Sequence, residues 1–191
     1  MVSLREQAKA HRRAELLAAA ARLFAADGFH ATTLGAVAAE AGVSAPAVYR
    51  HFESKADLLA QMLVGVSESL LEGGRAACES ASPLRSLCTA HARFAVNESA
   101  VIRVQERDLA SLDAGPRHRV RSLQAEYVQL WVAALGPSVP DADEAELRLR
   151  VHAAFGLLNS TPHALRRSGA VSDPVGLFTN LAMATLTAPR R

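Results

Sequence analysis

The sequence predicts an all-α protein in which a three-helix helix-turn-helix domain, residues 1–53, precedes a second helical domain, residues 54–191. Three observations support this prediction. Apolar residues recur at the spacing of one helix face, and no segment shows the alternation of apolar and polar residues that a half-buried strand requires. Gly and Pro residues then divide the chain into segments of helical length.

The expected helices begin and end at recognisable residues. Ser3 and Glu6 have the spacing of a capping box before the first helix, and Ser54 and Asp57 repeat that spacing before the fourth. Pro162 is expected to bend or end the helix that contains it. The expected helices cover about 6–26, 33–41, 44–52, 54–74, 83–98, 101–112, 117–135, 142–166 and 174–187.

Composition narrows the class of protein. The 191 residues carry a formal net charge of +2, which is only weak evidence for a nucleic-acid partner. Cys78 and Cys88 belong to no CxxC or zinc motif and are expected to be reduced thiols. Because the sequence contains neither a signal peptide nor a membrane span, we expect a cytoplasmic protein with no membrane partner. It also contains no P-loop, GxGxxG, GxSxG or HExxH motif, so we expect neither an enzyme nor a cofactor or metal.

Residues 34–53, LGAVAAEAGVSAPAVYRHFE, have the pattern of a helix-turn-helix. Ala38 is small enough for two helices to cross closely. Gly42 can adopt the positive φ that the tight turn needs, and Val48 would face back to the first helix. The pattern therefore predicts that residues 44–52 are presented to a groove of double-stranded DNA.

Residues 21–63 resemble the TetR family of transcriptional repressors. The resemblance covers about the first third of the chain, and the later helices are similar to the family only in number, length and spacing. It implies a homodimer whose second domain binds a ligand and dimerises, and which leaves its operator when a small molecule binds. The matching features are Phe24, Gly28–Phe29, Thr32–Thr33, Ala38, Ala41–Ser44, Tyr49, His51–Phe52, Lys55 and Leu58–Leu59.

The resemblance also implies roles for individual residues. Thr33 would cap its helix and contact a phosphate, and the recognition helix would start at Ser44, Ala45, Pro46 and Ala47. Tyr49, His51 and Lys55 would contact phosphates.

This sequence departs from many family members at positions 45 and 46, since neither Ala45 nor Pro46 has a side-chain donor for a base edge. Base recognition would then depend on thymine methyl groups, on Ser44, and on Arg50 if that side chain points into the groove.

The second domain offers candidate ligand contacts. The aromatic residues at helical spacing after Pro116 fit core packing, and lining a pocket is the alternative. Asn159 lies on an apolar helix and needs a polar partner, either another side chain or the ligand. The effector could be a hydrophobic molecule or, by a loose resemblance to family members that sense such compounds, an acyl-CoA. The candidate pocket residues are Phe94, Tyr127, Trp131, Phe155 and Asn159.

Two apolar stripes near the C-terminus are candidates for the interface of a homodimer. A dimer would place two recognition helices about 34–36 Å apart on a pseudo-palindromic operator. Two alternatives remain open: a DNA-binding activator or architectural protein without a ligand, and a protein-interaction module that uses its helix-turn-helix to bind another chain. The stripes consist of Leu147, Val151, Ala154 and Leu158, and of Leu177 and Leu181.

Overall fold

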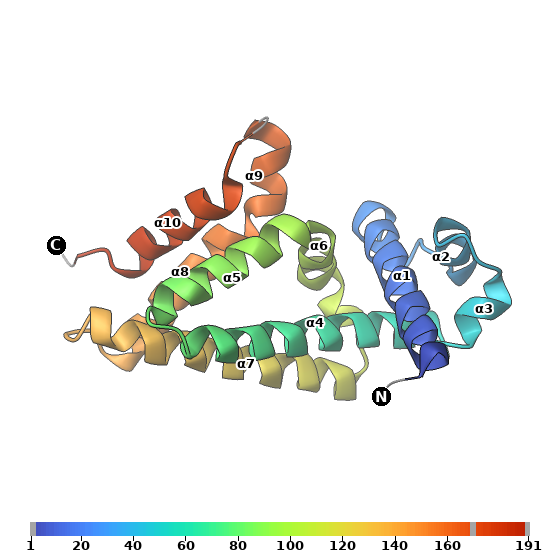
Figure 1. Cartoon of the computed structure of the whole chain (residues 1–191), viewed down its shortest axis with the longest axis horizontal. Coiled ribbons are helices and arrows are strands. Elements are labelled where there is room, and N and C mark those ends of the chain that lie inside the picture. The colour runs from blue at the N-terminus through green and yellow to red at the C-terminus, as the bar shows by residue number, and fades with distance from the viewer. Residues whose placement is uncertain (1–2, 169–170, 190–191) are drawn as a thin grey trace. The chain divides into compact units, whose positions relative to one another are not determined.

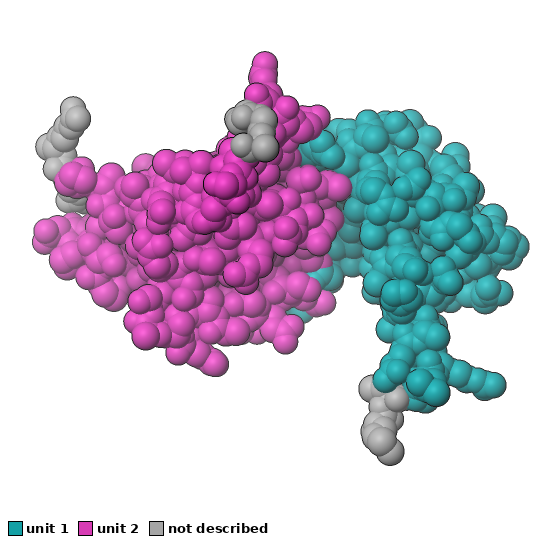
Figure 2. Space-filling view, turned by 45° about the horizontal axis from the view of Figure 1, so that its top comes forward, with its two compact units in different colours: residues 1–65, 103–119 teal, residues 66–102, 120–191 magenta. Residues whose placement is uncertain are grey.

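The computed structural model describes residues 3–168 and 171–189, and within them every regular element is a helix (Figure 1). The all-α prediction is confirmed. The chain packs as two compact units (Figure 2). Unit 1 contains residues 1–65 and 103–119, and unit 2 contains residues 66–102 and 120–191. The expected division at 53/54 marks the start of a helix and not the limit of a packing unit, because that helix contributes to both units.

Unit 1 is built around the helix-turn-helix. It contains α1 (Leu4–Asp27), α2 (Leu34–Glu40), α3 (Ala45–Tyr49), the 3-10 helix η1 (Leu109–Ser111), and parts of α4 (Lys55–Cys78), α6 (Ser99–Asp108) and α7 (Ala114–Leu135). Its core consists of side chains that are almost completely buried, among them Leu16, Phe24, Val37, Val48, Phe52, Leu58 and Leu59.

Side-chain caps determine where the helices of unit 1 begin. Glu6 N donates to Ser3 Oγ at 3.2 Å, and Ser3 N donates to Glu6 Oε2 at 2.8 Å, which completes the predicted capping box. At the start of α4, Asp57 N donates to Ser54 Oγ at 3.0 Å, and the Asp57 carboxylate accepts from Glu53 N. Both caps supply partners for N–H groups that have none inside the helix.

Unit 2 contains the remaining parts of α4, α6 and α7 together with α5 (Pro83–Asn97), the 3-10 helix η2 (Gly136–Ser138), α8 (Glu144–Asn159), α9 (Thr161–Ser168) and α10 (Pro174–Leu186). Helix α10 packs against α5 and α8. The expected helix 142–166 is in fact two helices. The break falls at Ser160, and Pro162 lies in the first turn of α9, where its missing N–H costs nothing.

The predicted dimer stripe on α8 is wrong for three of its four residues. Val151, Ala154 and Leu158 have no exposed surface, because this face of α8 packs inside unit 2 against neighbouring helices. Leu147 is half-buried, while Leu177 and Leu181 on α10 remain 47% and 44% exposed. The solvent-facing apolar stripe of α8 instead consists of Leu149, Ala153 and Gly156.

Within residues 3–168 and 171–189, no helix combines the length and the apolar character needed to cross a lipid bilayer.

Candidate DNA interface and candidate effector site

The turn between α2 and α3 is made by Gly42, whose φ is +66°. Val43 N donates to Ala38 O at 2.9 Å and Gly42 N donates to Ala39 O at 3.1 Å, so the turn is closed by the backbone of α2. A Cβ added at Gly42 would meet no atom within 4 Å. Glycine is therefore needed here for its φ and not for lack of space.

Helix α3 has one buried and one exposed side. Ala47 and Val48 are buried against α2, so α3 is fixed by its own apolar residues. Ser44, Ala45 and Pro46 are exposed at its N-terminal end. The Ser44 hydroxyl makes no capping hydrogen bond, which leaves it available to a base or phosphate.

Two further side chains extend the exposed side of α3. Tyr49 is 60% exposed, an unusual exposure for an aromatic residue within a compact unit, and Arg50 is exposed beside it. Thr33 is also exposed, and its Oγ1 accepts from Ala36 N at 3.1 Å, which confirms its predicted capping role.

His51 lies among positive charges. Its Nδ1 is buried without a hydrogen-bond partner. Burial lowers the pKa of its imidazole, and the charges of Lys9, Arg50, Arg13 and Arg12 lower that pKa further. The imidazole is therefore neutral near pH 7, and a phosphate anion placed among these groups would favour its protonated form.

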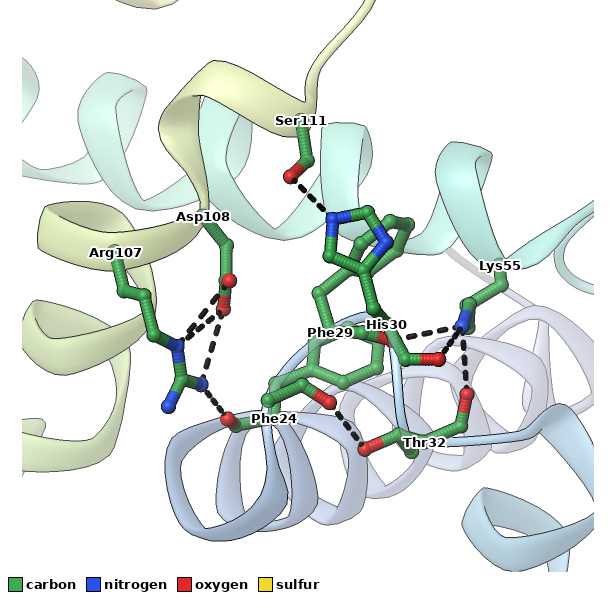
Figure 3. Close-up of polar contacts among 9 residues, drawn as sticks. Phe24, Phe29, His30, Thr32, Lys55, Arg107, Asp108 and Ser111 are labelled. Atoms are coloured by element: carbon green, nitrogen blue, oxygen red, sulfur yellow. Dashed lines mark hydrogen bonds and ion pairs between the residues drawn. The ribbon is translucent and has the colours of Figure 1, made fainter.

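The ammonium group of Lys55 is used inside the protein. Its Nζ donates to the carbonyl oxygens of Phe29, His30 and Thr32 at 2.7, 3.1 and 2.7 Å, and lies 4.7 Å from the centre of the Phe29 ring (Figure 3). An ammonium has three donors, and all three are used. Lys55 thus fixes the loop between α1 and α2.

The same loop is contacted from α6 and η1. An Arg107 guanidinium N–H donates to Phe24 O at the end of α1, and Arg107 pairs with the buried Asp108 carboxylate at 3.1 Å (Figure 3). Ser111 Oγ lies 3.3 Å from His30 Nε2. Residues on α4 and on α6–η1 therefore both position the segment that leads into α2.

A cluster of aromatic and polar side chains fills the interior of unit 2 around His91 of α5. The rings of His91, Phe155 and Tyr127 are nearly parallel and lie at the corners of a triangle. The centroid distances are 5.0 Å from His91 to Phe155, 5.8 Å from His91 to Tyr127 and 5.7 Å from Tyr127 to Phe155. The edges of Phe94 and Trp131 complete the cluster, each 5.9 Å from His91.

The polar atoms of this cluster form one directed chain of hydrogen bonds. His91 Nε2 lies 3.1 Å from Asn159 Oδ1, which can only accept, so Nε2 carries the proton. His91 Nδ1 then accepts from the Tyr127 hydroxyl at 3.2 Å. Burial lowers the pKa of His91 to about 4 and raises the pKa of Tyr127, so both groups are neutral. The Trp131 N–H lies close enough to influence the Tyr127 hydroxyl but completes no hydrogen bond of its own.

A small groove in unit 2 is bordered by the Tyr127 ring. Its volume is about 160 Å³, and it is lined by Ser69, Leu70, Gly73, Gly74, Ala90, Phe94 and Tyr127. Helices α4 and α7 approach closely here, since a Cβ on Gly74 would lie 2.6 Å from Tyr127 Cε2. Only glycine permits this approach.

Comparison with known proteins identifies the family. The family model "Bacterial regulatory proteins, tetR family" matches residues 16–62. The transcriptional repressor KstR2 of Rhodococcus jostii is 30% identical over 158 residues, which span 80% of this chain and 77% of that protein. The chain belongs to the TetR family of transcriptional regulators.

A further relative and two solved structures are also similar to the regulator. The transcriptional activator FasR of Mycolicibacterium smegmatis is 41% identical over 66 residues, 35% of this chain and 30% of that protein. A TetR-family regulator from Bordetella parapertussis has the same fold, with a TM-score of 0.81 and 24% identity over 91% of this chain and 93% of that chain. AibR, solved with isovaleryl coenzyme A and operator DNA, also has it, with a TM-score of 0.75 and 17% identity over 94% of this chain and all of that chain.

Two of the predicted DNA contacts of the regulator need correction. The Ala47 side chain is buried, so it stabilises α3 and cannot reach a base. All three donors of the Lys55 ammonium are occupied by backbone carbonyls, so Lys55 positions the loop and has no donor left for a phosphate in this arrangement. The predictions for Thr33, Ser44, Ala45, Pro46, Tyr49, Arg50 and His51 all concern residues with exposed or partly exposed side chains.

The structure brings the five candidate pocket residues of the regulator together, and adds one that the sequence did not indicate. Phe94, Tyr127, Trp131 and Phe155 all contact the His91 ring, and Asn159 hydrogen-bonds to it. The expected side-chain partner of Asn159 is thus His91. A histidine at helical spacing from Phe94 and Cys88 gave only a weak signal, because a lone histidine on an apolar helix face has many possible roles.

Proposed function

We propose that the regulator is a homodimeric repressor that is released from a pseudo-palindromic operator when an acyl-CoA thioester binds unit 2. The observation that carries the proposal is the pairing of an exposed α3 surface in one unit with a polar cluster and an adjacent groove in the other. Helices α4, α6 and α7 each continue from one unit into the other, so a change of conformation in unit 2 has a covalent route to unit 1.

The proposed choice of ligand rests on two kinds of support. AibR, which has the same fold, is bound to isovaleryl coenzyme A in its structure. In this chain, Arg75 and Arg93 are exposed and directly follow or precede groove residues, Gly74 and Phe94. Arg75 also pairs with Glu126 at 3.0 Å, so the support from charge rests on Arg93. An exposed arginine next to a groove residue in the sequence suits a ligand with an acyl group and a phosphorylated carrier.

The proposed dimer uses the exposed apolar residues of α8 and α10. Leu149 is 70% exposed, and Leu177 and Leu181 are the other large exposed apolar side chains of these helices. An isologous interface would cover all three on both subunits. The substitution Leu149→Glu together with Leu181→Glu should give a monomer in size exclusion with light scattering, whereas a dimer with unchanged mass would contradict this interface.

Release requires that the ligand bind one conformation more tightly than the other. The test begins with selection of genomic DNA by the purified regulator. Operator binding is then followed by fluorescence anisotropy while acyl-CoA is added, with free CoA as the control. We expect acyl-CoA, and not CoA, to lower operator affinity by about tenfold or more.

A second candidate is transcriptional activation, which the name of the relative FasR favours. In-vitro transcription from the selected operator distinguishes the two: repression by the regulator alone supports the proposal, and stimulation supports activation. In either case we infer that the protein acts in the cytoplasm, on the chromosome, and has no catalytic role.

A further inference from the structure

Building on the proposed function, we propose that the effector carries a short acyl group, no larger than an isovaleryl group or one aromatic ring, and that His91 sets this limit as a positioning residue behind Tyr127.

The space beside Tyr127 fits a small acyl group. The groove beside Tyr127 has a volume of about 160 Å³. Cavities of roughly 150 Å³ in protein interiors bind a single benzene molecule. A groove of this size can therefore take a branched short chain or one ring, and a fatty acyl chain would have to extend past its inner wall.

The groove has an outer and an inner end. Ser69 is exposed and lies at the outer end, whereas Tyr127 is only 5% exposed and forms the inner wall. The groove is narrow at its inner end, because Gly74 already brings α4 against the Tyr127 ring. An acyl chain that enters beside Ser69 would thus end against Tyr127.

The Tyr127 ring resists displacement because it is packed against other rings and its hydroxyl is hydrogen-bonded. The Tyr127 ring is nearly parallel to the rings of His91 and Phe155, at interplanar angles of 20° and 8°. Its hydroxyl donates to His91, which in turn donates to Asn159. Moving Tyr127 inward or aside would leave buried polar atoms without partners, at a cost of about fivefold or more in affinity for each atom.

Chain-length selectivity of the wild-type regulator is the first test. Calorimetric titration of the full-length protein would compare CoA, isovaleryl-CoA, benzoyl-CoA, decanoyl-CoA and stearoyl-CoA. We expect isovaleryl-CoA or benzoyl-CoA to bind at least about tenfold more tightly than stearoyl-CoA. Equal or tighter binding of stearoyl-CoA would overturn the inference and leave the proposed function intact. If no acyl-CoA binds better than CoA, the proposed function fails and this inference fails with it.

Removing the support behind Tyr127 is the second test. His91→Ala should raise the affinity for decanoyl-CoA relative to isovaleryl-CoA by about tenfold, since the wall can then move inward. Leu186→Ala, which truncates a fully buried residue of α10, is the matched control for a cavity elsewhere in unit 2 and should leave this ratio unchanged. An unchanged ratio in a folded His91→Ala protein contradicts the role of His91.

Filling the groove tests the inference without disturbing the cluster, in case His91→Ala does not fold. Ala90 lines the groove and is half-buried, so Ala90→Leu should weaken isovaleryl-CoA binding by about tenfold. Ala125→Leu makes the same change at an exposed position of α7 and should have no effect. Wild-type isovaleryl-CoA affinity in the Ala90→Leu protein would overturn the inference.

Discussion

The polar contacts that hold the loop between α1 and α2 in unit 1 differ in their partners from those of the His91 cluster in unit 2. In unit 1, Lys55 and Arg107 donate to backbone carbonyls of Phe29, His30, Thr32 and Phe24. In unit 2, the chain from Tyr127 through His91 to Asn159 joins side chains to side chains.

This difference suits the two tasks. Contacts to backbone fix the path of the chain, which a surface that must match a DNA groove requires. A buried chain of side-chain hydrogen bonds fixes the positions of the side chains that would border a ligand.

The buried network of unit 2 should make stability depend on pH. The pKa of His91 is about 4 in the folded protein, against 6.5 for an unperturbed histidine, so the unfolded chain binds a proton first as pH falls. The contribution of His91 is complete above about pH 6.5, declines toward pH 4, and amounts to roughly 3 kcal/mol.

Urea unfolding of the wild type and of His91→Gln at pH 7.5 and 4.5 measures this contribution. The difference in unfolding free energy between the two pH values should be smaller in the variant by about 2–3 kcal/mol. An identical pH dependence in the two proteins would show that His91 is not buried as a neutral group.

The stability of the turn between α2 and α3 should depend on the φ of Gly42 and not on side-chain packing. A β-branched residue at the φ of Gly42 is strained, so Gly42→Val should cost about 1–3 kcal/mol and greatly weaken operator binding. Thermal unfolding and anisotropy measure both effects. Gly65→Ala, in a helix with open space around it, is the control and should increase stability by about 0.5–1 kcal/mol. Equal effects of the two substitutions would contradict this account of the turn.

Lys55 should affect DNA binding because it positions the loop between α1 and α2, and not because its charge attracts a phosphate. Lys55→Met leaves three carbonyl groups without their donor and should lower both stability and operator affinity, each by about 1–2 kcal/mol. The salt dependence of operator binding should keep its slope, because no phosphate contact is lost. If the slope of log affinity against log salt concentration decreases by about one, Lys55 contacts a phosphate.

The smallest expected effects separate contacts to phosphate from contacts to bases on the exposed face of α3. Tyr49→Phe removes a hydroxyl from a side chain that is 60% exposed, and should weaken binding to all sequences by about 1 kcal/mol. Arg50→Ala should change which bases are preferred. Selection of binding sites from random DNA with each variant measures this, and an unchanged consensus for Arg50→Ala would place Arg50 outside the groove.

The sequence predicted local features well. Gly42, the Ser3–Glu6 capping box, the Ser54 cap and the all-helical fold depend on residues within a few positions of one another, so their physical causes are visible in the sequence. The resemblance to the TetR family added the roles of α3, although Ala47 faces inward because a helix of five residues has too few positions to reveal its buried side.

Features that depend on distant residues were not predictable. The partners of Lys55 lie in a loop more than twenty residues earlier, and Arg107 reaches back to Phe24. Helix α8 has two apolar stripes, and spacing alone does not tell which one faces the core. The stripe with Val151 is buried, and the one with Leu149 is exposed. For the same reason His91 became visible only when α5, α7 and α8 were placed together.

We propose that DNA binding by unit 1 and acyl-CoA binding by unit 2 oppose each other. The most direct test is to titrate the regulator with its selected operator at fixed salt, in the presence and absence of saturating isovaleryl-CoA. The account predicts a loss of operator affinity of about tenfold or more, and an equal loss of isovaleryl-CoA affinity when operator is bound. Operator affinity that is the same with and without bound isovaleryl-CoA would contradict it.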